Sequence, residues 1–176
     1  MTGLKELEKG LLKEVGTLLK ARGIAHRLVG QAFRLPKPYG WAALQLSFVE
    51  HPPVDVDVVV NTAIRVDEVQ DIIQDKDDPL IRKADLERSA TIGCELGNWQ
   101  GSGQRRWTVA TEADVASVAS SILAEFDSVA LPLIEKYSDL HVLLLELKAG
   151  NEKAKLLSPF ESKRLKTIAA MEQILS

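Results

Sequence analysis

The sequence is poor in cysteine and in long apolar runs, and it has no excess of positive charge. Cys94 is the single cysteine among 176 residues. A lone cysteine excludes an internal disulfide framework and a CxxC-type zinc cluster, and it fits a reducing compartment, so we expect the cytoplasm. No apolar run is longer than residues 142–145, and Glu6, Glu8 and Glu14 interrupt the N-terminal pattern. We therefore expect no membrane span and no secretory signal.

The charge balance bears on partners and the length on domain number. Lys plus Arg is 22 and Asp plus Glu is 25, so the net charge is 22 − 25 = −3. A negative chain has no general attraction for phosphate backbones, so we expect no nucleic acid as partner, although a local basic patch stays open. The length and 45% apolar residues fit one domain, residues 1–176, with a substantial core.

Hydrophobic periodicity predicts the order of helices and strands. Alternation of apolar and polar residues predicts five strands, at 24–35, 41–50, 54–61, 89–96 and 105–109. Helical spacing predicts an amphipathic helix at 4–20 and a short helix at 66–75 with Asp67 as a possible N-cap. Further helices are predicted from the cap Thr111 to a break before Pro132, at 131–136, between Ser138 and Gly150, and from a capping box at 158–161.

This order separates the strands from most of the helices, which argues for an α+β fold rather than a doubly wound parallel sheet. The expected architecture is a mostly antiparallel sheet of about five strands, with an N-terminal helix and a C-terminal group of helices packed on one face. The polar members of the strand pattern are Gln45, Ser47, Asp55, Asp57, Asn61, Glu95 and Arg106. They predict a second, polar face, which is either solvated or a recognition surface.

One motif suggests catalysis. Glu146-Leu147-Lys148 follows an apolar run and resembles the ExK element of a large nuclease superfamily, in which a carboxylate holds Mg²⁺ and a lysine assists the attacking water. That chemistry requires 141–148 to be a strand with an acidic partner such as Asp139. Since Ser138 and Gly150 bracket the segment as a helix, a buried helix is the favoured interpretation and the nuclease remains the alternative.

Metal-binding patterns are weak. Asp55 and Asp57 project from the same face of one strand and would need a third ligand to hold a hard cation. The cluster at 75–78 lacks the Gly and Glu that a calcium-binding EF-hand needs, because Leu80 and Leu86 occupy those positions. The three histidines fall on separate elements. We therefore expect no metal and no cofactor.

Three further features have simple structural interpretations. Cys94 alternates with apolar residues, which predicts a buried, unreactive thiol rather than a nucleophile. The glycine-rich segment 97–103 lacks the order of a phosphate-binding loop and leads to a strand, so we expect a hairpin loop. Arg105, Arg106 and Trp107 combine two cations with an aromatic ring, a composition typical of binding patches.

Four short segments carry a family likeness: 41–47 (WAALQLS), 58–62 (VVVNT), 92–97 (IGCELG) and 106–107 (RW). Together they resemble the bacterial domain-of-unknown-function family 4304. The resemblance implies an N-terminal helix, strands with Gln-Xaa-Ser and Val-Asn elements, a strand with Trp and C-terminal helices. Thr62-Ala63 departs from the Leu-Gly expected there. Since that family brings no activity to transfer, Gln45, Asn61 and Trp107 are marked as pattern positions without catalytic roles.

These observations favour a cytoplasmic bacterial protein that binds a protein partner or a small molecule without catalysis, such as an immunity-type or accessory protein. The candidate binding residues are Gln45, Asn61, Arg106 and Trp107. The metal-dependent nuclease or phosphodiesterase using Glu146 and Lys148 is the alternative, and a self-associating structural module is a third class. The sequence leaves the oligomeric state open.

Overall fold

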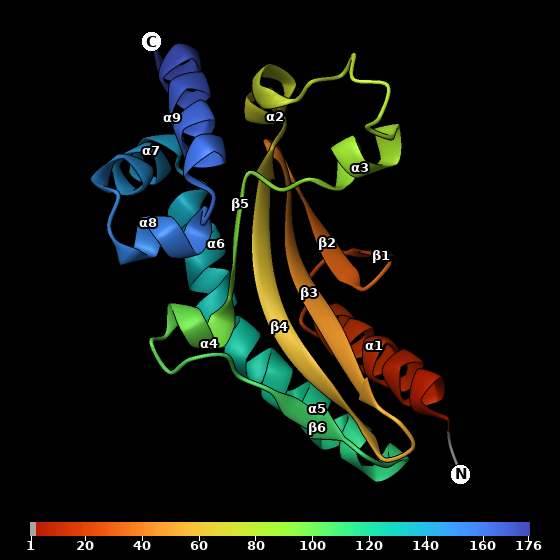
Figure 1. Ribbon diagram of the computed structural model, residues 1–176. Coiled ribbons are helices and arrows are strands. Elements are labelled where there is room, and N and C mark those ends of the chain that lie inside the picture. Colours follow the sequence, from red (N-terminus) through yellow and green to blue (C-terminus); the bar gives the residue numbers. More distant parts are fainter. Residues whose placement is uncertain (1–2) are drawn as a thin grey trace.

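The helices and strands follow the amphipathic patterns of the chain, and the fold is α+β. The computed structural model describes residues 3–176 (Figure 1). The strands are β1 (Arg27–Val29), β2 (Ala32–Lys37), β3 (Gly40–His51), β4 (Asp55–Val66), β5 (Ile92–Glu95) and β6 (Trp107–Val109). The helices are α1 (Leu4–Ala21), α2 (Asp67–Ile73), α3 (Lys83–Arg88), α4 (Leu96–Trp99), α5 (Glu112–Glu125), the π-helical turn η1 (Phe126–Ala130), α6 (Leu131–Tyr137), α7 (Leu140–Ala149), α8 (Glu152–Leu157) and α9 (Glu161–Leu175).

The sheet is antiparallel throughout and is organised around the long hairpin of β3 and β4, which runs along most of the molecule in Figure 1. The strand order is β1-β2-β3-β4-β5, and β6 also pairs with β4. β5 pairs with residues 61–64 of β4, whereas β6 pairs with residues 56–58. The predicted hairpin between these two strands is therefore wrong: both use the same edge of β4, which with 12 residues is long enough for both.

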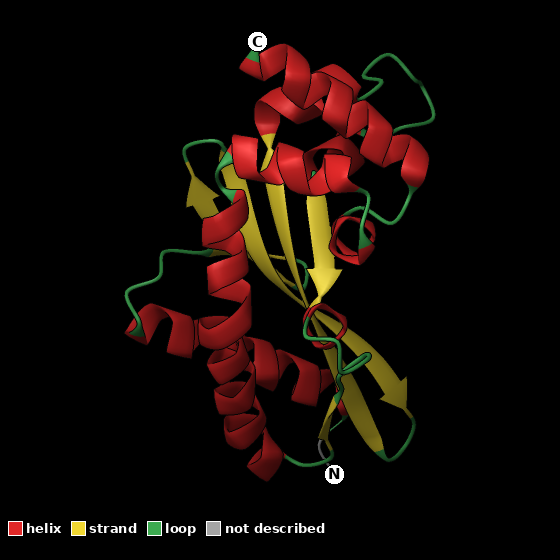
Figure 2. Ribbon diagram, turned by 90° about the vertical axis from the view of Figure 1, so that its left-hand side faces the viewer, coloured by secondary structure: helices red, strands yellow, loops and turns green. Residues whose placement is uncertain are grey.

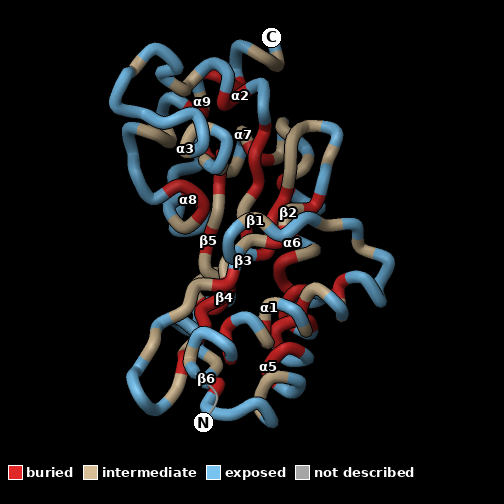
Figure 3. Tube along the Cα trace, turned by 90° about the vertical axis from the view of Figure 1, so that its right-hand side faces the viewer, coloured by how far each residue is buried: buried red, intermediate tan, exposed pale blue. Residues whose placement is uncertain are grey.

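The sheet has one covered and one open face. The side chains of Leu44, Leu46, Val58 and Val60 are fully buried on the covered face. α1 and α5 pack against each other and over this face, and Figure 3 shows the buried positions along β4 and on the inner sides of both helices. The next residues along the same strands, such as Gln45, point to the opposite, open face. The expected division into a covered and a polar face is confirmed.

α5, η1 and α6 form one continuous helix of 26 residues, Glu112–Tyr137, which is the long vertical helix of Figure 2. The predicted break before Pro132 is wrong. The Leu131 amide bonds to the carbonyl of Phe126 in the wider π-helical turn, and the helix passes through the proline, which has no amide proton to donate. By length and composition this helix could cross a membrane, but half of its most apolar window is buried inside the protein.

The helices after α6 gather at one end of the sheet. α9 packs against α2 and α7, and α8 packs against β5. Helix α7 confirms the prediction of a helix across 141–148, although its N-cap is Asp139 rather than Ser138. The predicted capping box at 158–161 does not form, because α9 starts at Glu161 with Phe160 as its N-cap.

Three local details refine the predicted elements. The first predicted strand is divided by Gly30, whose positive φ of 63° lets the chain turn between β1 and β2. Asp67 is the first residue of α2 and accepts a hydrogen bond from the Arg65 side chain, so the predicted N-cap role is wrong. Thr111 does cap α5, in a capping box with Asp114.

Candidate functional site

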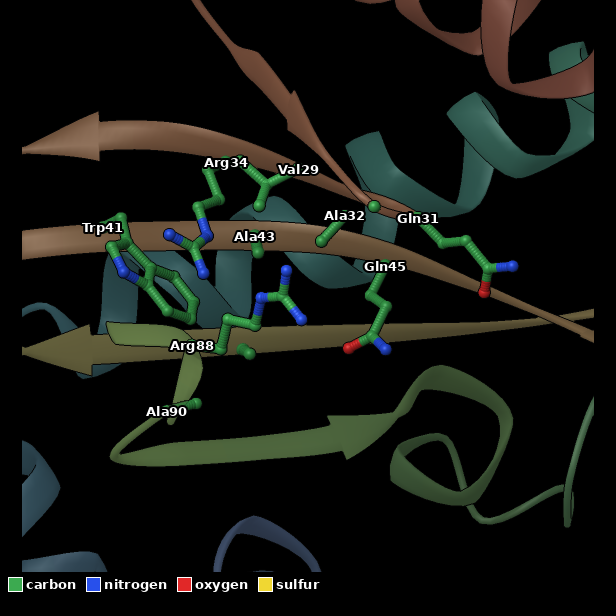
Figure 4. Close-up of a pocket in the computed structure, with 11 residues that line it drawn as sticks. Val29, Gln31, Ala32, Arg34, Trp41, Ala43, Gln45, Arg88 and Ala90 are labelled. Atoms are coloured by element: carbon green, nitrogen blue, oxygen red, sulfur yellow. The ribbon is translucent and has the colours of Figure 1, made fainter. Parts of the chain in front are cut away.

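A cavity of about 470 Å³ opens on the open face of the sheet, between the β1–β2 turn, the sheet itself and the segment that carries α3 (Figure 4). Its small lining residues are Val29, Gly30, Ala32, Ala43, Ala63 and Ala90. Its larger lining residues are Gln31, Arg34, Trp41, Gln45 and Arg88. Such a volume lies in the range of small-molecule sites, roughly 300–1,000 Å³.

The floor of the cavity consists of alanines on three neighbouring strands. Ala43 of β3 pairs with Ala63 of β4 and with Arg34 of β2, and Ala32 of β2 pairs with Gln45 of β3. Partners in register point to the same face of the sheet. Because alanine ends at Cβ, these positions leave the surface flat and hollow between the larger side chains.

Two arginines line one end of the cavity. The Arg34 guanidinium lies 4.6 Å from the centre of the Trp41 ring, and Figure 4 shows Arg88 reaching over the sheet from α3 toward the same place. Burial lowers the pKa of Arg34, and the nearby charges of Arg27, Arg65 and Arg88 lower it further, against one glutamate, Glu87. This end therefore has an excess of positive charge.

Neither arginine of the cavity has a carboxylate partner among the residues that the structure describes. Arg34 donates a 3.4 Å hydrogen bond to the carbonyl oxygen of Glu87, and the Arg88 side chain makes no hydrogen bond or salt bridge within residues 3–176. The hydrogen bond from Arg82 lowers the pKa of Asp85 and the charge of Arg88 lowers it further, but that carboxylate is already paired with Arg82. Guanidinium groups bind carboxylate and phosphate oxygens in fixed, often bidentate geometry. The two groups are thus free to bind an anion.

The α3 segment is held over the cavity by the buried side chain of Arg65. Its Nε donates to Asp67 Oδ1 at 2.7 Å, and its Nη1 donates to the carbonyl oxygens of Leu86 and Ser89, each at 2.7 Å. Gln74 Nε2 donates to the same Leu86 carbonyl, also at 2.7 Å. Arg88 lies between Leu86 and Ser89 in the chain. The hydrogen bonds to the carbonyls of these two residues therefore fix the position of the Arg88 backbone.

Amide side chains line the other end of the cavity. Figure 4 shows Gln31 and Gln45 at this end, away from Arg34, with the guanidinium group of Arg88 between Arg34 and Gln45. Gln45 pairs in register with Asn61, whose amide donates to Ser47 Oγ at 3.3 Å. Of the four residues proposed from the sequence, Gln45 lines the cavity and Asn61 lies beside it on the same face.

The other two proposed residues lie elsewhere. Arg106 is near the β3–β4 turn, where its Nη1 lies 3.5 Å from Asp57 Oδ2. Trp107 pairs with Val58 and packs against the core, and the guanidinium of Arg105 lies 4.8 Å from its ring centre. The structure therefore does not bring the four residues into one site, and their role in binding stays a prediction.

Four residues at or near the cavity, Arg34, Trp41, Arg65 and Arg88, are not among the candidate binding residues predicted from the sequence. Arg34 stands between two buried residues of β2, and Trp41 is the first residue of the predicted strand 41–50, so both could have been assigned to the open face. Arg88 gave no signal, because α3 was not predicted and lies far from β2 in the chain.

A cluster of possible metal ligands lies at the β3–β4 turn. One ligand atom from each of His51, Asp55 and Asp57 falls within 4.8 Å of the others, so the structure adds His51 to the two aspartates considered from the sequence. These groups also have protein partners. His51 Nδ1 lies 2.8 Å from Asp55 Oδ1, while Asp57 accepts a 2.7 Å hydrogen bond from the Thr108 hydroxyl and pairs with Arg106.

Glu146 and Lys148 lie on a helix. The strand that the nuclease alternative requires at 141–148 therefore does not form. Glu146 accepts hydrogen bonds from the Tyr137 hydroxyl at 2.7 Å and from Asn151 at 3.0 Å. The bond from Tyr137 lowers the pKa of Glu146, while burial raises the pKa of Tyr137. Lys148 pairs with Glu172 at 2.7 Å. These contacts connect neighbouring helices.

Two other sequence candidates have structural roles. Cys94 is buried on the covered face, as predicted, and burial raises the pKa of its thiol to about 12. The segment after β5 begins with α4 rather than a hairpin loop. The Glu95 carboxylate accepts from the backbone amides of Gly97, Asn98 and Arg105, which occupies the amides that a phosphate would need.

Comparisons of the chain with known protein families, with curated proteins and with solved structures find no match. The resemblance to domain-of-unknown-function family 4304 therefore stays a prediction.

Proposed function

We propose that this chain binds a small anionic molecule in the cavity on the open face of the sheet, without catalysing its conversion. The observation that carries the proposal is the pair of guanidinium groups of Arg34 and Arg88, which reach toward the same space without a carboxylate between them. A charged hydrogen bond contributes about 1.5–3 kcal/mol, so two arginines supply enough binding energy to select an anion.

The chemistry of the lining supports binding rather than catalysis. The 11 residues that line the cavity carry guanidinium, amide, indole and aliphatic groups. None of these side chains is a carboxylate, imidazole, thiol or hydroxyl, the groups that usually serve as general bases or nucleophiles. The site can hold and orient an anion, but its own side chains offer nothing to attack it.

We propose, as expected from the sequence, that the protein is cytoplasmic. Of the two expected kinds of partner, a protein or a small molecule, we propose the small molecule. A protein partner is a weaker candidate, because Arg106 and Trp107, the residues that suggested it, point to opposite faces of the sheet. The nuclease alternative loses support, because its strand is a helix and Glu146 is engaged by Tyr137, Asn151 and Lys136.

Thermal unfolding with added anions tests the proposal. Inorganic phosphate and citrate should raise the Tm of the wild-type protein more than sodium chloride of the same ionic strength does, because a ligand that binds the native state stabilises it. Arg34→Gln and Arg88→Gln should each lose this rise, whereas Arg106→Gln should keep it. A rise that survives in both cavity variants, or no rise with either anion, would overturn the proposal.

A further inference from the structure

The cavity has two chemically different ends on a flat floor. Trp41, Ala43 and Gln45 are alternate residues of β3 and point to the same face, so each step between them spans about 7 Å. Arg34 pairs in register with Ala43, and the amide end begins at Gln45. The Arg34 guanidinium lies over Trp41, two such steps from Gln45, and the Arg88 guanidinium lies between them. A ligand that reaches both ends must therefore carry its anionic group about 7–14 Å from a group that hydrogen-bonds to amides.

The charge at the arginine end favours a phosphate monoester over a carboxylate. The charges of Arg27, Arg65 and Arg88 act on the Arg34 guanidinium, against that of Glu87. Since Arg65 is paired with Asp67, the excess at this end comes from Arg27, Arg34 and Arg88. A phosphate monoester carries about −1.5 to −2 charges at neutral pH, whereas a carboxylate carries one, so the phosphate neutralises the excess better. Arg34 and Arg88 approach from different elements, β2 and α3, and each can bind a different oxygen.

The floor and the amide end favour a flat, hydrogen-bonding ring. Ala32 and Ala63 are partly exposed and leave a smooth surface on which a ring or a sugar can lie, while Ala43 is buried beneath the neighbouring side chains. Gln31 and Gln45 each offer both a donor and an acceptor, which is the combination that glutamine uses on the edge of a nucleobase. In a nucleoside monophosphate the phosphate and the base lie on opposite sides of the ribose, which matches the two ends of the cavity.

We infer that the anion bound in this cavity is a nucleoside monophosphate, with its phosphate at Arg34 and Arg88 and its base at Gln31 and Gln45. The inference rests on the proposed function, because it names the ligand of the same cavity. The guanidinium pair supplies affinity for the phosphate, and the glutamine amides supply preference among bases.

Titration calorimetry with defined probes tests the inference. The probes are AMP, GMP, CMP and UMP, together with ribose 5-phosphate, which lacks a base, and inorganic phosphate. At least one nucleotide should bind about tenfold more tightly than ribose 5-phosphate, since a well-placed glutamine discriminates by about that factor. Gln45→Ala should remove this preference and keep the binding of ribose 5-phosphate, whereas Arg34→Gln should weaken every probe.

Ser47→Ala is the matched control, because Ser47 lies on the same face of β3 next to Gln45 without lining the cavity. It should keep the preference for a nucleotide. If ribose 5-phosphate binds as tightly as every nucleotide, the inference is overturned while anion binding stands. If citrate binds and no phosphate compound does, the inference is overturned, while the proposed binding of an anion stands. If none of the anions binds, both the inference and the proposed function are overturned.

Discussion

The two ends of the open face are built on the same strands and treat charge in opposite ways. Near the β3–β4 turn, His51 hydrogen-bonds Asp55, and Asp57 has both Arg106 and Thr108 as partners. At the cavity, Arg34 contacts the Trp41 ring and a backbone carbonyl, and neither Arg34 nor Arg88 forms a salt bridge in the described part of the chain. Near the β3–β4 turn the charges are balanced within the protein, whereas the cavity has an excess of positive charge.

The difference teaches where to look for a ligand. Paired charges on a solvated sheet face contribute little to stability and need no further partner. Unpaired charges of one sign repel one another and are stabilised by an added counter-ion. The residues that looked most like a binding patch in the sequence, Arg106 and Trp107, belong to the balanced end, while the unbalanced end forms the cavity.

The largest expected effect concerns the sheet beneath both ends. Leu44→Ala removes a fully buried side chain from the covered face, and we expect the free energy of unfolding to fall by about 2–5 kcal/mol. Its neighbour Gln45 is exposed on the open face, and Gln45→Ala should change stability by about 0.5 kcal/mol or less. Urea denaturation measures both, and similar losses in the two variants would contradict the division of faces.

The next effect concerns the attachment of α3. Arg65→Met keeps the bulk of the side chain and removes its bonds to Asp67, Leu86 and Ser89, so we expect a loss of about 1–3 kcal/mol. Amide exchange of residues 83–90 should accelerate more than that of β3. The control is Arg82→Met, because Arg82 is exposed and its salt bridge is with Asp85 of its own segment. Equal exchange in both variants would show that Arg65 does not hold the segment.

Smaller changes should have opposite signs at the two ends. Arg88→Gln relieves repulsion with Arg34, while Asp85 keeps Arg82 as its partner, so the variant should stabilise the unliganded protein. Arg106→Gln removes a partner of Asp57 and should destabilise it. Each change should be about 0.5 kcal/mol or less, and both should shrink in 1 M salt. Urea denaturation at low and high salt measures them. A loss of stability in Arg88→Gln at low salt would show that its charge is balanced after all.

The smallest expected signal is the reactivity of Cys94 in the native protein. Its thiol pKa of about 12 leaves roughly 1% thiolate at pH 10, and its side chain is buried, so iodoacetamide should not label it until urea unfolds the protein. Intact mass measures the labelling. Fast native labelling would place Cys94 on an accessible surface and contradict the covered face.

The same pKa shift gives a pH dependence with a definite sign. The thiol of Cys94 binds its proton more tightly in the native state than in the unfolded state, where its pKa is near 9.0. This stabilisation is complete below pH 9 and is lost as the pH rises toward 12. Cys94→Ala should therefore lose less stability than the wild type between pH 8 and pH 10.

Most of the fold was predictable because its signals are local. Alternation of apolar and polar residues along 41–50 and 54–61 predicted β3 and β4 and their two faces. The helical spacing of apolar residues along 4–20 predicted α1. The wrong predictions concern features that depend on contacts between residues far apart in the chain. β5 and β6 share one edge of β4, and the helix continues through Pro132 because η1 accommodates it and both faces are packed.

The candidate site was predictable only in part, for the same reason. Gln45 and Asn61 could be assigned to the polar face because that assignment needs only the period of two residues in a strand. The cavity depends on Arg65, which binds backbone carbonyls 21 and 24 residues further along the chain, and on Arg34, which reaches a carbonyl 53 residues away. No pattern within a single segment marks such contacts.

The sequence by itself determined the α+β class, the long hairpin, the two faces of the sheet and the burial of Cys94, because side-chain periodicity within one element decides them. The tertiary structure alone decided that the segment 83–90 crosses the open face and that Arg88 meets Arg34 above a floor of alanines. The physical reason is that an excess of charge is a property of groups brought together in space, and the chain contributes these groups from three separate segments.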